Sequence, residues 1–137
     1  MTSVSLPRRR VGVLLHPTAL PGSPVCGGLG APARDWLKAL AQHGIGVWQI
    51  LPLSPPDGTG SPYSSPSSFA INPWLLDAKD LSDQGFLQPG DLEALPGVEA
   101  AEALLDFPLA DRRAAALARQ LRHCWDQLPN SHHADFD

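Results

Sequence analysis

Cysteine is scarce in this chain, in which Cys26 and Cys124 are the only two among 137 residues. Two cysteines provide neither the closely spaced set of a disulfide framework nor the paired ligands of a zinc site. Free thiols, as kept in a reducing cytosol, are therefore expected.

Long apolar runs are also missing. No segment approaches the roughly eighteen apolar residues of a membrane-spanning helix. The short run at residues 11–15 is too brief for the apolar region of a secretory signal peptide. We therefore expect a cytoplasmic protein without a membrane partner.

Basic residues are few, since 10 Lys and Arg stand against 14 Asp and Glu, for a net charge of −4. The only basic run, at residues 8–10, is interpreted as the solvated start of a strand. No basic stripe exists to neutralise phosphates, so nucleic acid is excluded as a partner. A neutral substrate, such as a sugar, fits this balance of charge.

Motifs for cofactors and metals are absent as well. The glycine-rich residues 25–30 lack both the Lys-Ser/Thr of a P-loop and the GxGxxG spacing, and we interpret them as flexible backbone before a helix. His132 and His133 have no third ligand at useful spacing. We therefore expect no cofactor and no metal.

What is present is an α/β pattern. Residues 10–15 and 46–51 are apolar runs typical of strands buried on both faces. Between them, Pro32 suits the first turn of a helix and Gly44 its end. An apolar stripe on this helix comprises Ala33, Trp36, Leu37, Leu40 and Ala41. The compact β-loop-α-β unit predicts parallel pairing with a right-handed crossover.

The second half of the chain is predicted to be mostly helical. Residues 74–77 are a short strand or a packed turn, and residues 81–95 are short helical pieces broken at Gly85, Pro89-Gly90 and Pro96-Gly97. A longer helix is expected from Asp111 to Leu128, with Arg112, Arg113, Arg119 and Arg122 largely off its apolar face. The polar residues 129–137 are expected to fray. We divide the chain into residues 1–80 and 81–137.

The loop at residues 60–73 is rich in Pro, Ser and Gly and carries Tyr63, the only tyrosine. Loops after buried parallel strands are where α/β enzymes place their sites. A fixed tyrosine offers a ring face for a sugar and a hydroxyl for a hydrogen bond. The residues alone leave open whether Tyr63 binds a ligand or packs to pin the loop. Asp57, in Pro-Asp-Gly, is interpreted as a turn former rather than a catalytic acid.

Three segments resemble the amylomaltases, the 4-α-glucanotransferases of the disproportionating-enzyme family. They are GVLLHPTALPG at 12–22, WQILPL at 48–53 and GSPYSSPSSFAINP at 60–73. The resemblance implies the start of a (β/α)8 barrel, α-1,4-glucan or maltooligosaccharide substrates, and transfer by retaining double displacement. It also implies that Tyr63 lines the subsite of the glucosyl unit that becomes covalently attached, with Ser61 nearby. The chain departs from the family at Gly28 and Gly60, where aspartate is usual.

A full barrel takes about 250 residues. We therefore expect an N-terminal fragment that lacks the catalytic carboxylates and is inactive alone. His16, at the end of the first strand, either faces the ligand or bonds to a neighbouring loop. The alternative function is a non-catalytic module that binds glucan or protein. A related hydrolase, with water as acceptor, also stays open.

Overall fold

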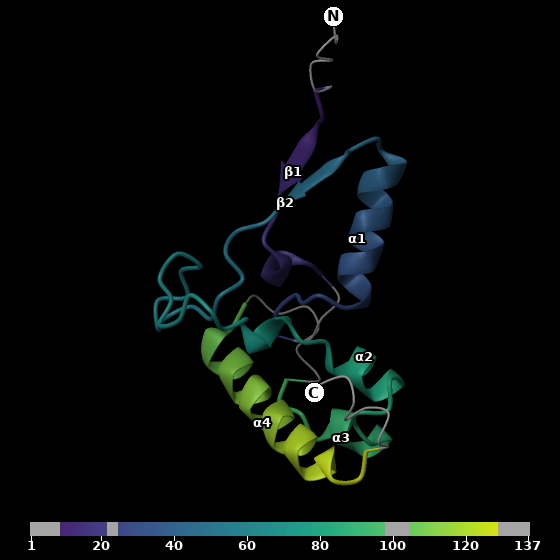
Figure 1. The fold of residues 1–137 in the computed structure, drawn as a ribbon, viewed down its shortest axis with the longest axis vertical. Coiled ribbons are helices and arrows are strands. Elements are labelled where there is room, and N and C mark those ends of the chain that lie inside the picture. The colour runs from purple at the N-terminus through teal and green to yellow at the C-terminus, as the bar shows by residue number, and fades with distance from the viewer. Residues whose placement is uncertain (1–8, 22–24, 98–104, 129–137) are drawn as a thin grey trace, which may run out of the picture.

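The computed structural model describes residues 9–21, 25–97 and 105–128. Its upper part in Figure 1 is a strand pair with one helix beside it, and its lower part is helical. The predictions for Arg8, for His132 and His133, and for the fraying of residues 129–137 lie outside the described residues. Among the residues described, no helix is long and apolar enough to cross a bilayer.

The sheet consists of β1 (Gly12–Leu14) and β2 (Val47–Gln49), which pair in parallel with Gly12 opposite Val47. The predicted parallel pairing is confirmed, but both strands are shorter than predicted. Burial on both faces is wrong, since Val11 is 67% exposed and Leu14 is 55% exposed. The physical reason is visible in Figure 1, where α1 is the only helix of the described residues beside the two strands, so much of the sheet is left uncovered by them.

Helix α1 (Ala31–Gln42) connects the strands and carries Pro32 in its first turn, as predicted. Gly44 ends it with φ of 70°, a left-handed conformation that glycine adopts without steric cost. The predicted stripe is only partly correct. Ala33 and Leu40 are buried, whereas Leu37 is 50% exposed and Ala41 is also exposed.

The segment before α1 is closely packed, which corrects its interpretation as flexible backbone. The Gly27 N–H donates to the Thr18 carbonyl at 2.9 Å, and the Leu29 N–H donates to the Leu75 carbonyl at 2.9 Å. A Cβ at Gly27 would lie 2.1 Å from the Pro17 carbonyl oxygen. Glycine is required there because backbone from another segment occupies the side-chain position.

The helical part contains the 3₁₀ turns η1 (Pro17–Ala19) and η2 (Pro73–Leu75), then α2 (Ala78–Asp83) and α3 (Pro89–Glu93). The packed turn expected at residues 74–77 is therefore confirmed by η2. Gly85 and Gly97 break the chain at φ of 84° and 83°. The break predicted at Pro89 is wrong, because Pro89 begins α3, where the first turn of a helix tolerates a missing N–H.

Helix α4 (Phe107–Trp125) begins four residues earlier than the predicted Asp111. Asp106 caps it by accepting a hydrogen bond from the Leu109 N–H at 2.9 Å. Such caps are worth about 1 kcal/mol. The prediction that Arg113 lies off the apolar face is wrong, since Arg113 is half-buried and its Nη1 donates to the Pro96 carbonyl at 2.8 Å.

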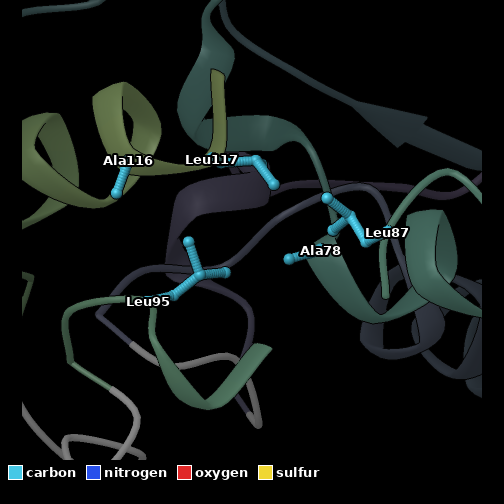
Figure 2. Close-up of a cluster of buried hydrophobic side chains, with 5 residues drawn as sticks. All are labelled: Ala78, Leu87, Leu95, Ala116 and Leu117. Carbon is cyan, nitrogen blue, oxygen red and sulfur yellow. The ribbon is translucent and has the colours of Figure 1, made fainter. Parts of the chain in front are cut away.

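The core lies between α4 and the shorter helices, where Figure 2 shows five buried side chains gathered around one interior space. They are Ala78, Leu87, Leu95, Ala116 and Leu117. The apolar face that the sequence predicts for this helix comprises Ala114, Leu117, Leu121, Cys124, Trp125 and Leu128. It is only partly confirmed, since Leu117 and Cys124 are both 4% exposed but Trp125 is 38% exposed. The helical part thus has an apolar core of its own.

Candidate functional site

The loop after β2 is closed at its base. The Asn72 N–H donates to the Leu53 carbonyl at 2.8 Å, joining the two ends of the loop. The Asn72 side chain is 3% exposed and accepts a hydrogen bond from the Trp74 N–H at 3.0 Å. The side-chain amide thus takes the place of a backbone acceptor at this turn.

Asp57 organises the first half of the loop. Its carboxylate accepts hydrogen bonds from the backbone N–H and hydroxyl of Thr59. The Gly60 N–H donates to the Asp57 carbonyl at 2.9 Å, and the Asp57 N–H donates to the Ser64 carbonyl at 2.7 Å. Asp57 is therefore a turn former, as predicted.

The Thr59 hydroxyl, and then the Thr59 N–H, hold the pKa of Asp57 below its ordinary 3.8. Because the pKa of Asp57 is lower in the folded than in the unfolded protein, its carboxylate stabilises the folded state at pH values above the unfolded pKa. This stabilisation is lost as the pH falls through the folded pKa. We expect an NMR titration of the Asp57 carboxyl to give a midpoint below 3.8. A midpoint at or above that value would contradict the turn geometry. Asp57→Asn keeps the acceptor oxygen and should make the Thr59 amide shift independent of this titration.

Tyr63 is 74% exposed. The interpretation in which it packs to pin the loop is therefore wrong. Ser61 is half-buried beside it, and its hydroxyl accepts a long hydrogen bond from the Tyr63 N–H at 3.4 Å. The Ser64 N–H donates to the Ser61 carbonyl at 3.1 Å. The phenol thus lies on a backbone turn whose hydrogen bonds are made within the loop.

Each ring nitrogen of His16 has a hydrogen-bond partner. Nδ1 lies 2.8 Å from the Thr18 hydroxyl oxygen, and Nε2 lies 3.4 Å from the Pro52 carbonyl oxygen. A carbonyl only accepts, so this geometry fits the tautomer with the proton on Nε2, in which Nδ1 accepts from Thr18. The loop-bonding alternative is the one that the structure shows, and it ties the end of β1 to the loop after β2.

A small cavity of about 160 Å³ lies on the inner side of the loop. His16, Gly60, Pro62, Trp74 and Phe107 are among the residues that line it. Tyr63 and Ser61 do not line it, so the structure separates these two candidates from His16. The loop therefore has an inner side that faces His16 and an outer side that exposes Tyr63.

Two aromatic residues of this cavity form a stacked pair. The ring centroids of Trp74 and Phe107 are 5.4 Å apart, at an interplanar angle of 18°. Trp74 Nε1 also donates to Asp111 Oδ1 at 2.8 Å. Sequence reasoning missed Phe107. The available signal was the glycine at position 60, whose missing side chain leaves room for this ring.

A larger groove of about 730 Å³ runs between α1, η2, α2 and α4. Its lining is mostly apolar and includes Cys26, Trp36, Arg113 and Leu117. Burial raises the pKa of Cys26 to about 11, with the charge of Arg113 acting in the opposite direction. This thiol is protonated at neutral pH and is a poor nucleophile. Cys26 and Cys124 are both free, as predicted.

Comparison with known proteins gives a consistent result. The sequence pattern of the 4-alpha-glucanotransferase family matches residues 15–136, and the chain belongs to this family. The 4-alpha-glucanotransferase of Thermus thermophilus is 47% identical over 83 residues, which is 61% of this chain and 17% of that protein. The chloroplastic/amyloplastic 4-alpha-glucanotransferase of Solanum tuberosum is 37% identical over 131 residues, which is 90% of this chain and 23% of that protein.

A solved structure agrees with these relatives. The amylomaltase from Streptococcus agalactiae in complex with acarbose superposes with a TM-score of 0.79 at 26% identity. The match covers 94% of this chain and 26% of that one. The chain thus spans about a fifth of the length of the curated relatives it matches. The resemblance to amylomaltases stated from the sequence is confirmed.

Proposed function

We propose that this chain forms the substrate-binding opening of a 4-α-glucanotransferase. Residues 1–80 contribute the first βαβ unit of a (β/α)8 barrel together with its sugar-site loop. Residues 81–137 are a mostly helical insertion. The family membership and the parallel pairing of β1 with β2 support this assignment.

The observation that carries the proposal is Tyr63, an exposed aromatic on a loop closed by hydrogen bonds. Aromatic faces stack on the apolar face of a sugar ring, and a ring held by a fixed backbone loses little entropy on binding. Ser61 supports it by accepting from the Tyr63 N–H. The net charge of −4 is compatible with neutral α-1,4-glucans as substrates. That a related amylomaltase was solved with acarbose supports a carbohydrate ligand.

The proposed reaction moves a maltooligosaccharide segment to the 4-hydroxyl of another glucan through a covalent glucosyl-enzyme. Retaining chemistry of this kind uses a nucleophile and an acid/base roughly 5 Å apart. In this proposal those carboxylates belong to later strands of the barrel. Tyr63 holds the glucosyl unit beside them, and no cofactor takes part. Water as the acceptor would give hydrolysis instead.

Tyr63→Ala tests the proposal in the glucanotransferase that carries this chain. We expect kcat/KM for maltooligosaccharide transfer to fall ten-fold or more, which corresponds to about 1.4 kcal/mol. Phe69→Ala is the matched control, because Phe69 lies on the same loop and is 98% exposed. Unchanged kinetics in Tyr63→Ala, or an equal loss in Phe69→Ala, would contradict the role of Tyr63.

A non-catalytic binding module is the second candidate, because the helical part has a core of its own and a groove of about 730 Å³ borders it. A module of this kind requires that the 137-residue chain folds by itself. Cooperative urea unfolding of the isolated chain, together with saturable maltooligosaccharide binding, would favour the module. An expanded or aggregated chain would favour the barrel proposal, since two short strands have little stability alone.

A further inference from the structure

Phe107, at the start of α4, occupies the position where a side chain at residue 60 would lie. A Cβ built on Gly60 would be 2.2 Å from Phe107 Cε2 and 2.3 Å from Cζ. Gly60 also has φ of 74°. The ring therefore lies directly against the loop backbone, three positions before Tyr63.

The same helix holds the far end of the loop. Trp74 follows the buried Asn72 that closes the loop, and it stacks on Phe107. One turn further along α4, Asp111 accepts the hydrogen bond of the Trp74 indole. Helix α4 thus contacts the loop near its start through Phe107 and just beyond its end through Asp111.

The contact at Gly60 is linked to the turn that carries Tyr63. The Gly60 N–H is bonded to Asp57, Asp57 is bonded to Ser64, and Ser64 is bonded to Ser61. These bonds join Ser61 and Ser64, on either side of Tyr63, to Gly60, against which the Phe107 ring lies. Gly60 and the turn that carries Tyr63 are therefore joined by backbone hydrogen bonds.

We propose that Phe107, Trp74 and Asp111 are positioning residues that fix the sugar-binding loop, so that the helical second half of the chain sets the place of Tyr63. This inference rests on the proposed function. A misplacement of about 1 Å can cost on the order of 100-fold in rate when a group must be aligned with a reacting centre. In this proposal the three residues act through Tyr63 and do not contact the sugar themselves.

A double-mutant cycle tests this in the glucanotransferase that carries the chain. We expect Phe107→Ala alone to lower kcat/KM for maltooligosaccharide transfer roughly five- to ten-fold per folded enzyme. In the Tyr63→Ala background, Phe107→Ala should cost less than about two-fold, because a positioning residue has no effect once its target is removed. If Phe107 had only a structural role, Phe107→Ala would lower the amount of folded enzyme, and its effect on kcat/KM would be the same with and without Tyr63.

Asp111 provides a variant that leaves the apolar contacts intact, because it is an exposed residue of α4. Asp111→Leu removes the acceptor for Trp74 and should lower kcat/KM roughly three-fold, with wild-type far-UV circular dichroism. Asp111→Asn keeps an acceptor oxygen and should restore the wild-type value. Arg112 is the next residue of α4 and is also exposed, so Arg112→Leu is the matched control and should leave kcat/KM unchanged.

The outcomes separate the two proposals. Coupling in the cycle and rescue by Asp111→Asn support the positioning role. Additive losses, or a Phe107→Ala enzyme with unchanged kcat/KM while Tyr63→Ala is impaired, would overturn the positioning role and leave the proposed function standing. A Tyr63→Ala enzyme with normal kinetics would overturn both.

Discussion

Gly60→Ala is expected to lower the free energy of unfolding by about 3 kcal/mol. Two costs add at this position. A residue with a side chain at φ of 74° is strained by about 1 kcal/mol or more. The new methyl group would also overlap the Phe107 ring, which has to move out of its stack with Trp74. Urea unfolding of the purified glucanotransferase that carries this chain, monitored by circular dichroism, measures the loss.

Two other glycines separate these costs. Gly44 has φ of 70° but open space around its Cβ position, so Gly44→Ala reports the backbone strain alone. Gly58 has neither a positive φ nor a neighbour within 4 Å, so Gly58→Ala should be close to neutral. A loss in Gly60→Ala no larger than that in Gly44→Ala would show that Phe107 does not occupy this space.

Leu117→Ala is expected to destabilise the protein by about 3 kcal/mol, within the usual range for a buried leucine. Leu117 is 4% exposed and belongs to the cluster shown in Figure 2. Truncation removes apolar contacts and leaves a cavity that the surrounding helices only partly fill. The same urea measurement gives the difference in free energy of unfolding.

Leu37→Ala on α1 is the control, because Leu37 is 50% exposed. It should cost less than about 1 kcal/mol, since much of its side chain already faces solvent. Similar losses for Leu37→Ala and Leu117→Ala would mean that the cluster around Leu117 is not the main core of the helical part.

Helix ends and turns, which depend on neighbouring residues, were predicted well from the sequence. Proline and glycine act on the backbone of their own neighbourhood, so Pro32 and Gly44 correctly indicated where α1 begins and ends. The role of Asp57 was predicted for the same reason, because its partner Thr59 lies two residues away. These features depend on contacts within a few positions of the chain.

Features that depend on distant segments were not predictable in this way. Burial of β1 was wrong because it requires knowing what covers each face of the sheet. The close packing of Gly27 depends on the backbone of Pro17, and the need for Gly60 depends on Phe107. In the candidate site, Tyr63 could be proposed from the sequence because its motif is local, whereas Phe107 was missed because it lies 47 positions from Gly60.

The parallel pairing of β1 with β2 has a consequence for synthesis on the ribosome. Gly12 pairs with Val47, 35 positions later, so the first strand emerges roughly 2–7 s before its partner at ordinary translation rates. A helix such as α1 forms within about a microsecond. Vectorial synthesis therefore sets the order of events, with the crossover helix available before the second strand arrives. During that interval the nascent chain carries an unpaired strand. A holding chaperone would then protect this strand from pairing with another chain.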